Sequence, residues 1–148
     1  MAEPNGNGAV EGQRLSEEHL EIEGEDDIVL ARQQAREAAR RLGFGMVDQS
    51  RIATAVSELT RNVVRYATDG RGTVRIRSLS SRGGKGIEIK VSDQGPGIAD
   101  VEEAMRAGFT SGPGLGLGLP GTRRLMDEMQ IDSSLGSGTV VTIRKWRR

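Results

Sequence analysis

The sequence contains no cysteine, which excludes disulfide bonds, thiol nucleophiles and zinc sites built on thiolates. Its only histidine, His19, lies in a polar opening stretch, so a general base has to come from a carboxylate. Lysine plus arginine and aspartate plus glutamate number 21 each, so no net charge draws the chain to nucleic acid or to an anionic membrane. The basic stretch from Arg144 to Arg148 is typical of a solvated end and gives little support for a nucleic-acid module.

Long hydrophobic runs are also missing. No apolar segment approaches the ~20 residues that cross a bilayer, and the N-terminus lacks the basic and then apolar pattern of a signal peptide. We therefore expect a cytoplasmic protein without a membrane partner. A length of 148 residues suits one domain with a real core. Residues 1–25 are polar and rich in glycine and glutamate, which predicts a flexible tail before a folded domain at residues 26–148.

Apolar residues at helical spacing predict two long helices, at residues 28–42 and 48–67. The second helix has a clear core line, formed by Ile52, Val56, Leu59 and Val63. Alternation of apolar and polar residues then predicts two antiparallel strands, around residues 74–77 and 87–92, joined by the loop "SSRGGKG".

The second half of the chain continues with a short helix, a glycine-rich loop, a further helix, and two strands in "MQIDSS" and "GTVVTIRKW". Helices and antiparallel strands in this order predict a two-layer α/β sandwich. Helices should cover one face of the sheet and leave the other face solvated.

The glycine-rich loop has glycine at every second position from Gly112 to Gly118 and leads into a helix that starts with Leu119 and Pro120. Such a loop is either a flexible linker or a segment that brings bare backbone N–H groups close to an anion. The partial positive charge of the following helix N-terminus favours phosphate.

Two further segments suggest chemistry. In "SELTRN", Glu58 and Asn62 are four residues apart and share a helix face, so they could serve as general base and as an oxygen ligand for Mg²⁺, or form an ordinary polar face. In "VSDQGPGIAD", Asp93 ends a central strand and could accept an exocyclic amino group, with Gly95 and Gly97 letting a ligand approach the backbone. The same letters also make a good turn without a ligand.

Several common nucleotide motifs are excluded. The letters Gly116-x-Gly118-x-x-Gly121 match the dinucleotide fingerprint, but no strand precedes them and no acidic residue follows at the required distance. Lys85 is followed by glycine, which excludes a Walker A motif, and the eukaryotic protein-kinase signatures are missing. A bound nucleotide would need another type of site.

Together, "SELTRN", "DQGPGI", "GPGLGLGL" and the later "GSGT" resemble, in order and spacing, the N box, the two glycine boxes and the terminal threonine of the GHKL ATPases. Within that superfamily, "LGFG", "DQSRIATAVSEL" and "LPGTRRLMDE" resemble the anti-sigma factor kinase group, and in it the RsbT-type switch kinases of the stressosome pathway. The resemblance covers the chain from about Ile28 onward. It implies the Bergerat fold, a mixed, mostly antiparallel sheet covered by helices on one face, with ATP under a lid at about residues 107–119.

The resemblance also implies roles for individual residues. Glu58 would be the general base or a carboxylate that orients water, and Asn62 would bind Mg²⁺ that bridges the phosphates of ATP. Asp93 would accept a hydrogen bond from the adenine amino group, with Thr139 assisting through a water molecule. Gly95 and Gly97 would let the base and sugar approach. The lid residues that would contact the phosphates are Gly112, Gly114, Leu115, Gly116, Leu117, Gly118 and Leu119.

For function, the resemblance implies an ATP-dependent serine/threonine kinase that phosphorylates STAS-domain antagonist or scaffold proteins, in a large stressosome complex, and that activates a PP2C-type phosphatase when released. The alternative is a protein that sequesters a sigma factor or another partner with ATP as ligand. Many relatives carry histidine where this chain has Tyr66, so no role is assigned to Tyr66. The helix arginines could contact phosphate or a partner, but exposed arginines on helices are usually solvated, and we expect that of Arg61, Arg65, Arg123 and Arg124.

Overall fold

The computed structural model describes residues 16–67, 69–81, 83–95 and 118–147. The elements, in chain order, are β1 (Glu17–Ile22), α1 (Glu25–Arg41), α2 (Met46–Tyr66), β2 (Gly72–Ser81), β3 (Gly84–Asp93), α4 (Gly118–Leu125), β4 (Glu128–Ser134) and β5 (Gly138–Trp146). The predicted short helix and most of the predicted lid lie outside the described residues, as do Gly97, Gly112, Gly114, Leu115, Gly116 and Leu117.

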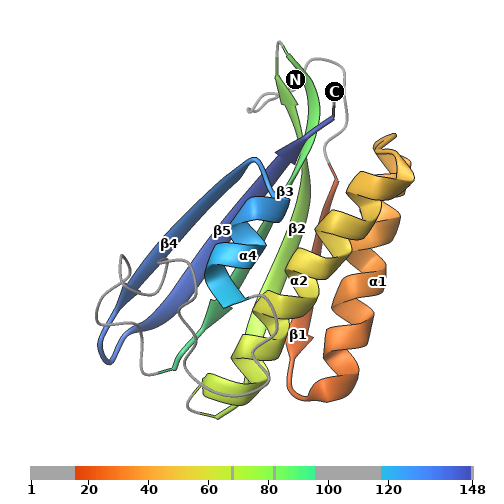
Figure 1. The fold of residues 1–148 in the computed structure, drawn as a ribbon. Helices are drawn as coiled ribbons and strands as arrows, with labels where there is room; N and C mark the ends of the chain where they lie inside the picture. Colours follow the sequence, from red (N-terminus) through yellow and green to blue (C-terminus); the bar gives the residue numbers. More distant parts are fainter. Residues whose placement is uncertain (1–15, 68, 82, 96–117, 148) are drawn as a thin grey trace, which may run out of the picture.

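The strands form one sheet in the order β1-β2-β3-β5-β4, and each neighbouring pair is antiparallel. The helices α1, α2 and α4 cover one face of this sheet, which confirms the predicted two-layer sandwich (Figure 1). The strand β3 lies in the middle of the sheet, as the sequence predicted. The residue at its end, Asp93, is therefore flanked on both sides by other strands.

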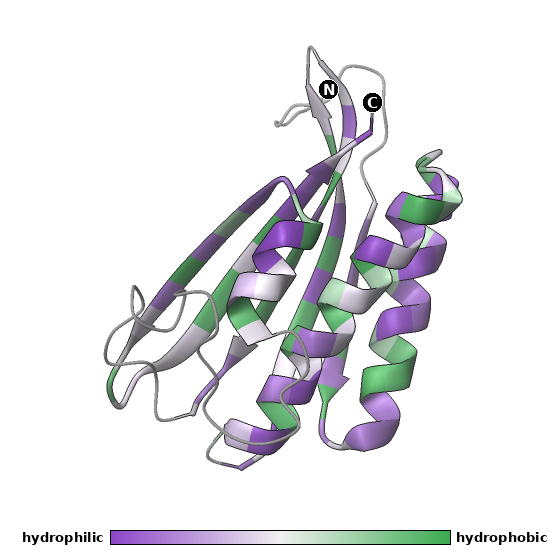
Figure 2. Cartoon of the chain, viewed as in Figure 1, coloured by the Kyte–Doolittle hydropathy of each residue, from purple (hydrophilic) through white to green (hydrophobic). Residues whose placement is uncertain are grey.

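The core fills the space between the helices and the sheet. The apolar stripes of the helices turn toward the sheet, and the opposite helix faces are largely hydrophilic (Figure 2). Ala31 and Ala35 of α1 are fully buried, and these small side chains let α1 pack closely against α2. The predicted core line of α2 is buried at Ile52, Val56, Leu59 and Val63. Among the described residues, no helix is long and apolar enough to span a bilayer.

The interpretation of residues 1–25 as a flexible tail was wrong for its last part. Residues 17–22 form β1, which pairs with β2 at the sheet edge, and Ile22 is fully buried. Leu20 lies opposite Val74 on the helix-facing side, so Glu21, between Leu20 and Ile22, points the other way, whereas Glu18 faces α1 and pairs with Arg41. The backbone N–H of Ser16 also donates to Ser78 Oγ at 2.8 Å. His19 remains largely exposed, as expected.

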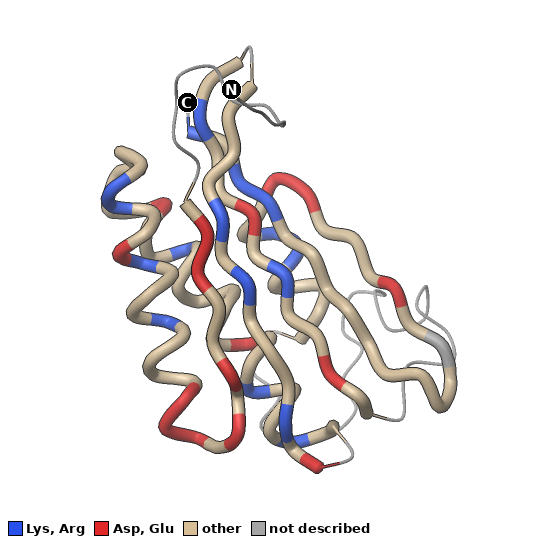
Figure 3. The backbone as a smooth tube through the Cα atoms, turned by 180° about the vertical axis from the view of Figure 1, so that it is seen from behind, with Lys and Arg blue, Asp and Glu red and all other residues tan. Residues whose placement is uncertain are grey.

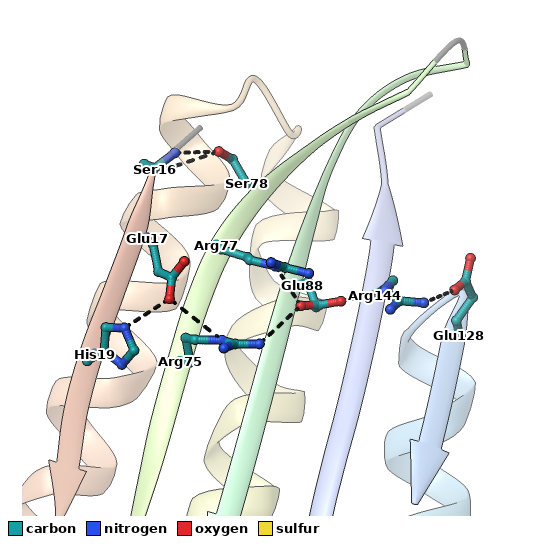
Figure 4. Close-up of polar contacts among 9 residues, drawn as sticks. All are labelled: Ser16, Glu17, His19, Arg75, Arg77, Ser78, Glu88, Glu128 and Arg144. Atoms are coloured by element: carbon teal, nitrogen blue, oxygen red, sulfur yellow. Dashed lines mark hydrogen bonds and ion pairs between the residues drawn. The ribbon is translucent and has the colours of Figure 1, made fainter. Parts of the chain in front are cut away.

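Charged residues recur along the strands (Figure 3), and those that alternate with the buried core residues lie on the face of the sheet opposite the helices. One row alternates in sign across all the strands and is called the charge ladder here: Glu17, Arg77, Glu88, Arg144 and Glu128. Glu88 at its centre is only 2% exposed and accepts hydrogen bonds from Arg77 Nε at 2.8 Å and Arg144 Nε at 2.7 Å (Figure 4). Burial alone would raise the pKa of Glu88, but these bonds outweigh it and hold the pKa below its ordinary value.

Candidate functional site

The described segments that carry the predicted site residues meet at one end of the sandwich. The last turns of α2, the end of β3, the start of β5 and the first turn of α4 all lie there (Figure 1). A packing contact ties α2 to the strands at this point. A Cβ added to Gly72 would lie 2.8 Å from Val63 Cγ1 on α2 and 2.3 Å from the carbonyl oxygen of Ser92, so helix and sheet are in close contact beside Asp93.

Glu58 is a buried carboxylate in the second half of α2. It sits on α2, one helical turn before Asn62, and is only 8% exposed. Its Oε2 accepts a hydrogen bond from Arg61 Nη1 at 2.9 Å, whereas its Oε1 is buried and has no hydrogen-bond partner among the described residues. Buried carboxylate oxygens are normally paired, so this oxygen marks a place where a donor from outside the described chain fits.

The neighbouring hydroxyl groups do not donate to Oε1 of Glu58, because both have other acceptors. Ser57 Oγ donates to the carbonyl oxygen of Ala53 at 3.0 Å, and Thr60 Oγ1 donates to that of Val56 at 2.7 Å. Both hydroxyls are therefore engaged within their own helix. Asn62 is partly exposed, which leaves its amide within reach of solvent or a ligand, and Tyr66 at the end of α2 is exposed.

The structure gives Arg61 a contact that the sequence analysis did not predict. Its side chain is 32% exposed and pairs with Glu58 three residues earlier, so it is not simply solvated. The spacing of the two residues was visible in the sequence, because charges three apart on a helix are neighbours. The burial of Glu58 could not be predicted from the sequence, because it depends on the elements that pack against α2, which include α4 and the sheet.

Asp93 is placed by strand register. It ends β3 on the helix-facing side, in line with Val91 and Ile89, and lies opposite Gly72 on β2 and Thr139 on β5. Asp93 Oδ1 accepts a hydrogen bond from the backbone N–H of Gly95 at 2.7 Å, which fixes one carboxylate oxygen. Gly95 is buried at the start of the turn that the sequence predicted.

The start of β5 is held against Asp93 by a glycine. Gly138 has φ of 82°, and a Cβ there would lie 2.1 Å from the carbonyl oxygen of Asp93, so no other residue fits without moving the backbone. Thr139 follows directly, and its Oγ1 shares a hydrogen bond of 2.8 Å with Ser133 Oγ. The "GSGT" segment therefore positions a hydroxyl group beside Asp93 on the neighbouring strand.

The N-terminus of α4 completes the described part of the site. Gly118 is buried with φ of 68°, a backbone conformation that favours glycine, and Leu119 is half-buried beside it. Thr122 Oγ1 donates to the carbonyl oxygen of Gly118 at 2.9 Å, which stabilises the first turn. A helix start of this kind has unpaired N–H groups and partial positive charge, which suit a phosphate.

This arrangement fits a nucleotide with a magnesium ion. Asn62 offers one neutral oxygen, and Mg²⁺ commonly takes one or two protein ligands and completes its shell with phosphate oxygens and water. Among the described residues, no group of three or more histidine or acidic side chains could hold a metal by itself. The predicted base, metal-binding and adenine-binding positions thus lie on elements that meet at one end of the fold.

Comparisons with known proteins identify the family of the chain. Residues 24–145 match the histidine kinase-like ATPase domain family. The serine/threonine-protein kinase RsbT of Bacillus subtilis is 50% identical over 87% of this chain and 96% of that protein. The anti-sigma F factor of Thermoanaerobacter sp. is 35% identical over 64% of this chain and 68% of that protein.

A solved structure of the RsbU and RsbW domains of Rv1364c from Mycobacterium tuberculosis shares the fold, with a TM-score of 0.58 and 22% identity over 90% of this chain. This chain spans 33% of that longer one. The profile match and the RsbT relative together cover nearly all of the described fold, including the segments around Glu58, Asp93 and Gly138. The chain therefore belongs to the histidine kinase-like (GHKL) ATPase domain family, in the branch that contains RsbT and the anti-sigma factors.

Proposed function

We propose that this protein is an ATP-dependent serine/threonine kinase of a bacterial stress-signalling partner switch. The observation that carries the proposal is the buried Oε1 of Glu58, which has no hydrogen-bond partner among the described residues. Glu58 lies one turn from Asn62 in the second half of α2, the helix that contacts the sheet beside Asp93 through Val63. The 50% identity to a serine/threonine-protein kinase over nearly the whole chain supports the same reaction.

In the proposed reaction, the hydroxyl oxygen of a serine or threonine on a partner protein attacks the γ-phosphorus of ATP. The bond from that phosphorus to the oxygen of the β-phosphate breaks, ADP leaves, and the hydroxyl proton passes to Glu58. Oε1 of Glu58 is the acceptor, because Oε2 is already bonded to Arg61. The products are ADP, the phosphorylated partner and a protonated Glu58 that returns its proton to water.

In the proposed site, residues at the strand ends and at the start of α4 bind the nucleotide. The second carboxylate oxygen of Asp93 would accept the adenine amino group, and Thr139 would assist through a water molecule. Gly95 would let the base lie against the backbone, and the N–H groups at Gly118 and Leu119 would face the phosphates. Asn62 would hold Mg²⁺, which supplies charge neutralisation at the phosphates when bound. The roles of Gly97 and of the lid residues from Gly112 to Leu117 remain proposals from sequence.

For partners, we propose STAS-domain antagonist or scaffold proteins as substrates, a PP2C-type phosphatase as the target that the released kinase activates, and a stressosome-type complex in the cytoplasm. The relative named serine/threonine-protein kinase RsbT supports this assignment. The balanced charge of the chain supports partners other than nucleic acid.

A second candidate function is sequestration of a sigma factor with ATP as ligand, and the 35% identity to anti-sigma F factors favours it. The two functions share an ATP site and differ in whether phosphate reaches a STAS-domain protein. A direct binding assay against a sigma factor would separate them if phosphate transfer were lacking.

The experiment that tests the proposed function is transfer of phosphate from radiolabelled ATP to STAS-domain proteins of the same genome, with Glu58→Gln beside the wild type. We expect the wild type to label one of them and Glu58→Gln to bind ATP but lose transfer by at least about 100-fold. Glu25→Gln, an exposed acid on α1, is the control and should keep full activity. Equal labelling by Glu58→Gln would refute the role of Glu58.

A further inference from the structure

Arg61 and Glu58 form an ion pair on α2. Arg61 Nη1 lies 2.9 Å from Glu58 Oε2, and both residues are on the same face of α2. The side chain of Arg61 is 32% exposed, so its guanidinium lies at the boundary between the core and the solvent. Glu58 therefore has one oxygen held from the solvent side and one oxygen, Oε1, in the protein interior without a partner among the described residues.

We infer that Arg61 is a positioning residue, which holds Oε2 so that Oε1 stays directed to the place of the reacting hydroxyl. This inference rests on the proposed role of Glu58 as the acceptor of the proton. It adds a residue that acts only through Glu58 and does not itself touch ATP or the partner protein.

The physical reason is that burial disfavours a charged carboxylate, whereas an ion pair stabilises it. A buried carboxylate without any partner is unfavourable, and a glutamate side chain has enough rotatable bonds to swing its carboxylate out to water. The short ion pair with Arg61 offsets this tendency at a residue that is only 8% exposed. Without Arg61, we expect Glu58 to populate outward rotamers, in which Oε1 no longer lies in the site.

A displaced base slows the chemical step while ATP binding stays the same. Misplacement of a reacting group by about 1 Å can cost on the order of 100-fold in rate. Arg61→Ala should therefore lower kcat by roughly 10- to 100-fold and leave the Kd for ATP within about twofold. Arg61→Lys keeps a cation on the same face and should recover part of the loss.

The chain offers a matched control. Arg51 forms the same kind of contact three residues after an acid on the same helix, with Arg51 Nη1 3.0 Å from Asp48 Oδ1, but near the opposite end of α2. Arg51→Ala removes an equivalent helix-surface pair without touching the site. We expect Arg51→Ala to keep the kcat of the wild type.

The deciding experiment is a double-mutant cycle with Glu58→Gln, Arg61→Ala and the double variant. ADP release and phosphate transfer to the STAS-domain substrate are measured in each protein, and ATP binding is measured by calorimetry. If Arg61 acts only through Glu58, Arg61→Ala slows the wild type but adds no further loss to Glu58→Gln.

The other outcomes separate this inference from the proposed function. A Kd for ATP that rises tenfold or more in Arg61→Ala, in both backgrounds, would mean that Arg61 binds phosphate, and would overturn the inference. A normal kcat in Arg61→Ala, with Glu58→Gln inactive, would overturn the inference and leave the proposed function intact. Full activity of Glu58→Gln would instead refute the proposed role of Glu58.

Discussion

The charge ladder on the open face of the sheet gives a quantitative prediction for stability. Glu88 is 2% exposed and accepts two short hydrogen bonds, from Arg77 and Arg144, with a longer contact of 3.9 Å from Arg75. Glu88→Gln keeps the shape of the side chain but removes its charge, so the variant leaves no cavity. Its effect reports the loss of the charge together with the loss of one acceptor, because an amide has only one acceptor oxygen for the two arginine donors.

The magnitude follows from the geometry. Hydrogen bonds to charged groups contribute about 1.5–3 kcal/mol each. The arginine side chains are 41% and 37% exposed, so they regain water when the carboxylate is lost, and we expect a net loss of about 2 kcal/mol. For a domain of this size, that corresponds to a fall in Tm of roughly 6 °C.

Urea denaturation at pH 7 measures this loss, with Glu128→Gln as the control. Glu128 also pairs with Arg144, at 3.0 Å, but its side chain is 50% exposed, so its loss should cost less than about 0.5 kcal/mol. A loss from Glu88→Gln that is no larger than that of the control would refute the reasoning.

The same variant predicts a pH dependence. The pKa of Glu88 in the folded protein lies below its ordinary value of 4.5, so its contribution to stability is present above that value. The contribution is lost as the pH falls through the lower folded pKa. The difference between wild type and Glu88→Gln should therefore be full at pH 7 and shrink below about pH 4. An equal difference at pH 7 and pH 3 would contradict the assignment.

Three further substitutions test the site and the fold. Gly138→Ala should weaken ATP binding at least about tenfold in calorimetry, because its Cβ displaces the backbone of Asp93. Gly136→Ala is the control, since Gly136 also has a positive φ but has open space around it. This control should lower stability by about 1 kcal/mol and leave ATP affinity unchanged. Thr139→Val should weaken ATP binding a few-fold in the same assay, since it removes the hydroxyl beside Asp93. Ile22→Ala should cost about 2–3 kcal/mol in urea denaturation if β1 is part of the core, and a cost below about 0.5 kcal/mol would contradict that.

Most of the fold could be predicted from periodicity, because the described helices and inner strands bury regular apolar stripes. The strand β1 escaped prediction because it is short and acidic, with only Leu20 and Ile22 facing the core, and its stability comes from pairing with β2. The hairpin of β2 and β3 is longer than predicted, since Ser81 and Gly84 are still paired at its tip. Backbone pairing between the strands continues there through residues that show no alternation of apolar and polar side chains in the sequence.

The identity of the candidate site residues could be predicted from the sequence, but their arrangement in space could not. The spacing of Glu58 and Asn62 places both on one helix face, whatever the rest of the fold. The position of Asp93 next to Thr139 depends on strand order and register, which join residues far apart in the sequence. The pairing of Glu58 with Arg61 follows from their spacing of three residues on one helix, but the burial of Glu58 depends on the elements that pack against α2, so no local pattern could reveal it.

The measurement that tests the central claim most directly is calorimetric titration of ATP with Mg²⁺ into the wild type and Asp93→Asn. This substitution keeps the size of the side chain and the turn at Gly95, but it can present an amide N–H₂ group where, in the proposed site, a carboxylate oxygen would accept the adenine amino group. We predict that the wild type binds one ATP and that Asp93→Asn binds at least about 100-fold more weakly while unfolding at a similar urea concentration. Equal affinity in the two proteins, or no binding by the wild type, would contradict a nucleotide site at the end of β3.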